Sequence, residues 1–160
     1  MATLNDLIGK VEAEVRQRVG SQSDSSLSDR TYPYFDARAV DKAIGDLRTV
    51  ASGFDAEFHK PGSAFEALSV LATVYGNTCH ALYEHWDRYA KTRSEADFRE
   101  ALGASELVNT LNAPRAIAAL RFLNAELFGD TQLAGYLDQS LWYLKTTLEN
   151  TARNASSLQS

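Results

Sequence analysis

Cysteine and methionine each occur once in this chain, as Cys79 and Met1. A single cysteine excludes an internal disulfide and a zinc site built on several cysteines. With no methionine beyond Met1, the core must be built without that adaptable side chain. Long apolar runs are also missing, since no stretch approaches the roughly 20 apolar residues that span a bilayer. We therefore expect no membrane association.

An excess of positive charge is missing as well: 21 acidic residues outnumber 16 basic ones, the formal net charge is −5 and the pI is about 5.2. A nucleic-acid-binding protein needs a basic face, and we expect no nucleic-acid partner here. The first ten residues hold no basic leader followed by an apolar run, which predicts a cytoplasmic protein. Apolar residues at 44 % and charged residues at 23 % of 160 are ordinary for one soluble domain, residues 1–160.

Apolar residues recur at spacings of three and four along most of the chain, which is the pattern of amphipathic helices. Residues that typically start or stop helices interrupt this pattern, and no long alternation of apolar and polar residues predicts a strand. The predicted boundary signals are a stop at Gly20, a second helix over about 36–59, a capping box at Ser63 and Glu66, a cap at Ser94, Pro114 in a first turn, a stop at Gly129 and a cap at Asp130. The sequence therefore predicts an all-α domain of five or six helices.

Two segments lack this apolar period. The serine-rich stretch Ser21 to Asp29, SQSDSSLSD, predicts a flexible linker over about 21–31. The polar tail over about 152–160 is expected to fray. The aromatic residues Tyr32, Tyr34 and Phe35, which follow the linker, suit either a partner-binding patch or a lid packed on the helices.

The most apolar helix is the third, and it contains Cys79 in a stripe with Tyr75, Leu82 and Trp86. Leu82 and Trp86 are expected in the core, as are Phe98, Leu102, Val108 and Leu111 on the fourth helix and Leu133, Leu137, Leu141, Leu144 and Leu148 on the last. Gly76 weakens the third helix by about 1 kcal/mol relative to Ala and is typical of a close approach by another group. Cys79 itself is either a small buried hydrophobe or a covalent anchor for a cofactor.

His80, Glu84 and Asp87 lie at i, i+4 and i+7 on the same helix. That spacing suits either metal ligands or a solvated polar face, and we favour the polar face because such pairs commonly stabilise helices. No phosphate loop, HExxH or Cys-x-x-Cys motif is present. We therefore expect no metal site, no catalytic residues and no enzymatic activity.

Four short segments stand in an order known from one protein family. They are Phe35 to Lys42 (FDARAVDK), Thr78-Cys79 followed by Arg88-Tyr89-Ala90, Asn109 to Pro114 (NTLNAP) and Ala134 to Asp138 (AGYLD). Together they resemble the phycobiliprotein family, whose domain is a globin-like arrangement of helices. The resemblance implies a globin-like fold and makes Cys79 the counterpart of the cysteine that carries an open-chain tetrapyrrole, or bilin.

The chain departs from the family directly after that cysteine. The family has an Arg-Asp pair, whose Asp holds the pyrrole nitrogens, where this chain has Ala81 and Leu82. The resemblance therefore implies either a bilin carrier or a chromophore-free relative associated with phycobilisomes. The alternative from a different class is a small helical scaffold or adaptor subunit with no cofactor. Each hypothesis predicts a non-enzymatic binding protein that forms homo- or hetero-oligomers with other protein subunits.

Overall fold

The structure, a computed structural model, describes residues 2–24, 37–52 and 57–159. Within these ranges the chain forms six helices: α1 (Leu4–Asp24), α2 (Ala37–Ala51), α3 (Ala64–Thr92), α4 (Glu95–Leu111), α5 (Ala113–Leu127) and α6 (Thr131–Gln159). The one β interaction among the described residues is an isolated bridge between Ala2 and Phe58. The all-α prediction is thus confirmed.

Short-range side-chain chemistry fixes the start of α3 and of α4. The Ser63 hydroxyl accepts a hydrogen bond from the Glu66 amide at 3.1 Å, and the Glu66 carboxylate accepts one from the Gly62 amide at 2.8 Å. Ser94 likewise accepts a hydrogen bond from the Asp97 amide at 3.2 Å. Each bond satisfies an amide that has no partner within its helix, as the sequence predicts.

The ends of α5 also follow the predicted signals. Pro114 occupies the first turn of the helix, where its missing N–H is not needed. Gly129 adopts the left-handed conformation with φ of 58°, and its amide donates to the Asn124 carbonyl, which stops the helix. The Asp130 carboxylate then accepts a hydrogen bond from the Leu133 amide at 2.8 Å and starts α6.

Two predicted helix boundaries are wrong. α1 continues through Gly20 to Asp24, so the first four residues of the predicted linker are helical, because a single glycine costs only about 1 kcal/mol in a helix. α2 ends at Ala51 and not near residue 59, and Phe58 instead pairs with Ala2. α6 is helical to Gln159, so it includes most of the tail that is predicted to fray. The rest of the linker and the aromatic residues Tyr32, Tyr34 and Phe35 lie outside the described residues.

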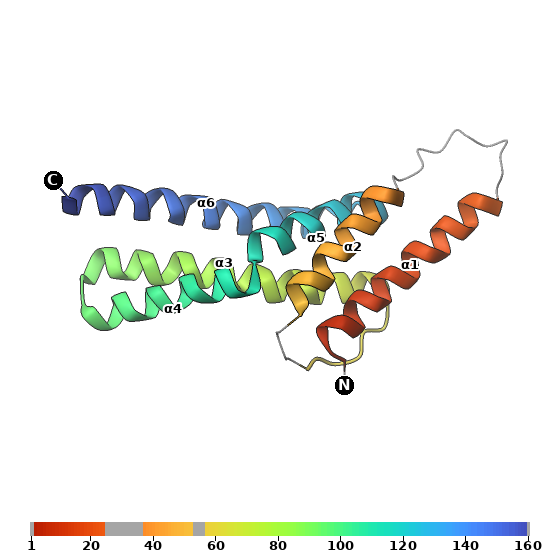
Figure 1. Ribbon diagram of the computed structural model, residues 1–160, viewed down its shortest axis with the longest axis horizontal. Coiled ribbons are helices and arrows are strands. Elements are labelled where there is room, and N and C mark those ends of the chain that lie inside the picture. Colours follow the sequence, from red (N-terminus) through yellow and green to blue (C-terminus); the bar gives the residue numbers. More distant parts are fainter. Residues whose placement is uncertain (1, 25–36, 53–56, 160) are drawn as a thin grey trace.

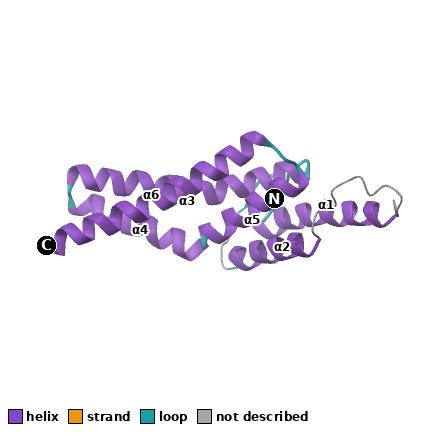
Figure 2. Cartoon of the chain, turned by 90° about the horizontal axis from the view of Figure 1, so that it is seen from above, coloured by secondary structure: helices purple, strands orange, loops and turns teal. Residues whose placement is uncertain are grey.

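α3 runs along the length of the molecule and contacts α1, α4, α5 and α6 (Figure 1). α4 folds back on it as an antiparallel hairpin, whereas α6 runs parallel to it. α1 and α2 lie at one end, and the turn between α3 and α4 lies at the other (Figure 2). We call this second end, which consists of α4 and the C-terminal halves of α3 and α6, the distal half.

The core is deepest where α3 meets α1 and α5. Leu68, Leu71, Tyr75 and Cys79 are completely buried there, as are residues of the other helices that face them. Toward the distal half the burial decreases. Leu82 is buried as predicted, but Trp86 is only partly buried. No helix among the described residues is long and apolar enough to cross a membrane.

Three of the predicted core positions on α4 and α6 are wrong. Phe98 is 36 % exposed, Leu102 42 % and Leu148 61 %. Their helices turn other residues inward, with Ala101, Ala104 and Val108 buried on α4 and Ser140, Leu144 and Thr147 buried on α6. The physical reason is that nothing in the described chain covers the side of the distal half on which the three lie.

Candidate functional site

Cys79 lies in the middle of α3 and is completely buried. Burial raises the pKa of its thiol to about 11, and the hydrogen bond with Thr78, which acts in the opposite direction, is the smaller effect. At neutral pH the sulfur is therefore protonated, whereas attack on a bilin requires the thiolate. A covalent bond from Cys79 needs α3 to open, or the thiol to be reached before the core closes.

Gly76, one turn before Cys79, leaves room for a flat group, and that group is a side chain of the protein itself. A Cβ atom placed on Gly76 lies 2.5 Å from Cε1 of the Tyr136 ring. The Tyr136 hydroxyl donates a hydrogen bond to Asn77 Oδ1 at 3.0 Å. The predicted close approach at Gly76 is confirmed, and it brings α3 and α6 together.

The polar residues that follow Cys79 do not converge on a metal. The His80 ring stacks on Tyr136, with centroids 5.5 Å apart, and also contacts Tyr143. Asp87 forms an ion pair with Lys91 at 3.0 Å. No group of three His, Cys, Asp or Glu side chains in the described residues is arranged to hold a metal ion.

Shifted pKa values identify no acid–base pair in the part of the chain that the structure describes. Hydrogen bonds from Thr3 lower the pKa of Asp6, and hydrogen bonds from Thr92 and Ser94 lower that of Asp97, so these two carboxylates are helix caps. Burial raises the pKa of Tyr75 to about 12, and burial also raises that of Tyr136. Tyr75 and Cys79 are completely buried and so out of reach of a substrate.

Trp86 holds the distal half together. Its indole N–H donates a hydrogen bond to the Ser105 hydroxyl of α4 at 2.9 Å. Its ring meets the rings of Tyr89 and Phe98 edge-on, with centroids 6.0 and 6.1 Å away. Trp86 thus links α3 to α4, yet it is only partly buried.

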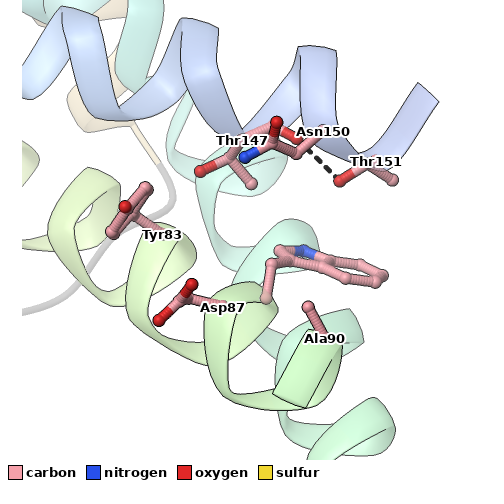
Figure 3. Close-up of a pocket in the computed structure, with 7 residues that line it drawn as sticks. Tyr83, Asp87, Ala90, Thr147, Asn150 and Thr151 are labelled. Carbon is pink, nitrogen blue, oxygen red and sulfur yellow. Dashed lines mark hydrogen bonds between the residues drawn. The ribbon is translucent and has the colours of Figure 1, made fainter. Parts of the chain in front are cut away.

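On the other side of Trp86 the packing between α3 and α6 is loose. A hollow of about 200 Å³ lies between the two helices and is lined by Tyr83, Trp86, Asp87, Ala90, Thr147, Asn150 and Thr151 (Figure 3). Pockets that enclose drug-sized ligands have volumes of about 300–1,000 Å³. The hollow is therefore too small to enclose a tetrapyrrole.

The two outer helices of the distal half have at most marginal contact with each other. Among the described residues, α4 packs on α3 and, more weakly, on α5, and α6 packs on α3 and α5. Leu102 is one turn from Phe98 and one turn from Ser105, so it lies on the side of α4 that meets Trp86. Leu148 lies between Leu144 and Thr151 on the matching side of α6.

We call the surface formed by Trp86, Phe98, Leu102 and Leu148 the open face. The five large hydrophobic side chains in the described residues that are more than a third exposed all lie on α4 or α6, and three of them belong to this face. Scattered exposed leucines are ordinary, but exposed apolar residues gathered on one face are typical of an interaction site.

The spacing of apolar residues in the sequence does not predict the open face, because it cannot show which side of a wide apolar stripe packs against a neighbouring helix. The sequence of α6 contains one indication. In α6 the stripe Ser140, Leu144, Thr147 and Thr151 becomes polar toward the C-terminal end, whereas Leu148 lies just beside it. Leu148 thus stands apart from the stripe that the structure buries.

Comparison with family models, curated proteins and solved structures found no match for this chain. The segments that resemble phycobiliproteins lie on α2, on α3, at the bend between α4 and α5, and on α6, and Phe35 and Asp36 of the first fall outside the described residues. The relationship to that family remains a hypothesis.

Proposed function

We propose that this protein is a non-enzymatic helical scaffold or adaptor subunit that binds another protein through its open face. The observation that carries the proposal is the gap between α4 and α6 above Trp86. α1 and α5 also pack on α3, and α1 lies at the end of the molecule away from the distal half (Figure 1). Apolar side chains in the distal half are left in contact with water, and docking of another chain removes them from it.

The chemistry of the described residues supports a binding role over a catalytic one. The groups with shifted pKa values are helix caps or members of the aromatic and core packing between α3 and α6. None of them stands beside a second group in a cleft, as a nucleophile and its base do.

Crosslinking inside cells tests the proposal. A photoreactive amino acid in place of Leu102 or Leu148 should give adducts of one discrete mass. The same amino acid in place of Glu84 should give none, because Glu84 is exposed and lies two residues before Trp86, on the opposite side of α3. The absence of adducts at Leu102 and Leu148, or equal adducts at all three positions, contradicts a docking role for the open face.

The pigment-carrying alternative from the sequence has its own test. Protein incubated with a bilin and separated on a denaturing gel shows zinc-enhanced fluorescence if the pigment is covalently bound. The burial and raised pKa of Cys79 lead us to expect no fluorescent band. A band that vanishes in Cys79→Ser supports the pigment carrier instead.

A further inference from the structure

Helix directions in the distal half determine which surfaces a docked protein meets. Successive residues of α6 contact successive residues of α3, with Tyr136 near Asn77, and Tyr143 near His80 and Tyr83. The two helices are therefore parallel. α4 turns back after Arg93 and runs antiparallel to both, as Figure 1 also shows.

Opposite charges flank the open face. Glu106 lies on α4 one residue after Ser105, and Lys145 lies on α6 between Leu144 and Leu148. Both are exposed, and neither forms an ion pair within the described residues, whereas neighbouring Arg99 and Asp138 do. One border of the face is thus negative and the other positive.

The two charges also lie at the same height along the molecule. The hydrogen bond between Trp86 and Ser105 places these two residues at the same height along α3. Because α4 runs antiparallel to α3, the next residue, Glu106, lies about 1.5 Å from that height in the direction of Tyr83. The ring contact between Tyr83 and Tyr143 places these two residues at the same height along α3. Because α6 runs parallel to α3, Lys145, two residues after Tyr143, lies about 3 Å from that height in the direction of Trp86. Since Tyr83 and Trp86 are about 4.5 Å apart along α3, Glu106 and Lys145 come out level.

A surface with this charge pattern is complementary to itself. A two-fold axis parallel to the helices turns one open face onto another and exchanges its two borders, while the height along the helices is kept. α4 of each copy then lies against α6 of the other. Glu106 of each copy lies beside Lys145 of the other, which gives two ion pairs in the dimer.

The size of the face fits such a partner. α4 has 17 residues, which makes it about 25 Å long, and the layer of α4, α3 and α6 is about 20 Å across at normal helix spacings. The projected area is about 500 Å², and side-chain relief brings the accessible area toward the roughly 800 Å² per partner of a standard interface. A single helix about 10 Å wide covers only about half of it.

We propose that the open face binds the open face of a second copy of this chain, with α4 of each copy against α6 of the other and paired ions between Glu106 and Lys145. This inference rests on the proposed function, because it names the protein that docks.

Sedimentation of purified charge-reversal variants tests the pairing. We expect the wild type to be a dimer, and Glu106→Lys or Lys145→Glu alone to weaken the dimer by about tenfold, because each turns two attractions into repulsions. An equal mixture of the two variants should regain wild-type affinity, since both ion pairs are restored in the heterodimer. Glu84→Lys, an equal charge change on the side of α3 away from Trp86, should leave the affinity unchanged.

A wild-type chain that sediments as a monomer of 17.6 kDa overturns the inference. A mixture of the two variants that binds no more tightly than each variant alone also overturns it, provided that circular dichroism shows both to be folded. The crosslinking experiment separates this failure from a wider one. If Leu102 and Leu148 form adducts with a different protein, the proposed function holds and the pairing of two copies is contradicted. If they form no adducts, both proposals are contradicted.

Discussion

Gly76 and Tyr136 set how closely α3 and α6 pack. Gly76→Ala gains about 1 kcal/mol of helix propensity. Its Cβ, however, falls within 2.8 Å of three Tyr136 atoms, whose ring is held by His80 and Asn77. Overpacking costs about 1–3 kcal/mol, so we expect Gly76→Ala to lower the free energy of unfolding by about 1 kcal/mol in denaturant titrations.

The reason for that loss can be checked in two backgrounds. Gly103 lies in α4 with no atom within 4 Å of an added Cβ, so Gly103→Ala should stabilise the protein. In Tyr136→Ala protein, Gly76→Ala should become stabilising as well, by about 1 kcal/mol. If Gly76→Ala stays destabilising without the Tyr136 ring, the close approach is not what makes glycine necessary there.

Tyr75 presents a different residue-scale cost, since its ring is completely buried and its hydroxyl has no hydrogen-bond partner among the described residues. An unpaired buried hydroxyl costs about 1–3 kcal/mol. We expect Tyr75→Phe, which keeps the ring, to leave the melting temperature unchanged or to raise it. A loss of more than about 1 kcal/mol shows that the hydroxyl has a partner.

The buried thiol makes stability depend on alkaline pH. Burial raises the pKa of Cys79 from 9.0 to about 11, so the unfolded chain loses this proton at a lower pH than the folded one. The stabilisation is complete below pH 9 and is lost as the pH rises through 11, by about 2–3 kcal/mol at most. Because Tyr75 adds a similar loss at higher pH, unfolding is best measured in Tyr75→Phe protein. There, Cys79→Ala should flatten the decline between pH 9 and 11, and an unchanged slope speaks against the raised pKa.

At the scale of the helices, the contribution of an apolar residue to the free energy of unfolding depends on whether its side of the helix packs against another helix. Leu144 is 7 % exposed and Leu148 is 61 % exposed, although both are leucines on α6, one turn apart. Leu144→Gln should cost about 2–5 kcal/mol through lost burial and an unpaired amide, while Leu148→Gln and Leu102→Gln should stay within about 0.5 kcal/mol of wild type. Thermal melts of the three variants, at protein concentrations below the dissociation constant of the dimer, measure these losses. Equal losses at Leu144 and Leu148 mean that another chain segment covers Leu148.

Helix starts and stops were predictable where chemistry within one turn decides them. Ser63, Ser94, Pro114 and Gly129 act on backbone groups a few residues away, and the sequence alone therefore located the starts of α3, α4 and α5 and the end of α5. Distant contacts decided the rest. The bridge from Ala2 to Phe58 lies beyond the end of α2, and no local signal in the sequence announces it.

The open face was unpredictable for a related reason. The spacing of Leu133, Leu137, Leu141, Leu144 and Leu148 fits a helical period, and so does the stripe Leu133, Leu137, Ser140, Leu144 and Thr147 that the structure buries. The choice between the two depends on where α3 and α5 sit around α6. The burial of Cys79, in contrast, follows from its place between Tyr75 and Leu82 in one stripe.

For the whole molecule, we expect stability to be uneven along α3. Among the described residues, the N-terminal half of α3 is covered by α1, α5 and α6, whereas the distal half has only α4 and α6 around it. Native-state hydrogen exchange should be slowest between Leu68 and Leu82 and faster beyond Trp86. Protein concentrated enough to dimerise should slow exchange in α4 and beyond Trp86 but not near Leu68. Uniform protection along α3 at low concentration contradicts this picture.

The parallel course of α3 and α6 has a consequence for the order of folding. Two adjacent parallel helices cannot be joined by a short turn, so the chain travels back along the molecule through α4 and α5 before α6 can pack on α3. The hairpin of α3 and α4 needs only a short loop to close, whereas the contact of Tyr136 with Gly76 closes a loop about 60 residues long. We expect Trp86→Phe, in the hairpin, to slow refolding, and Leu137→Ala, in α6, mainly to speed unfolding.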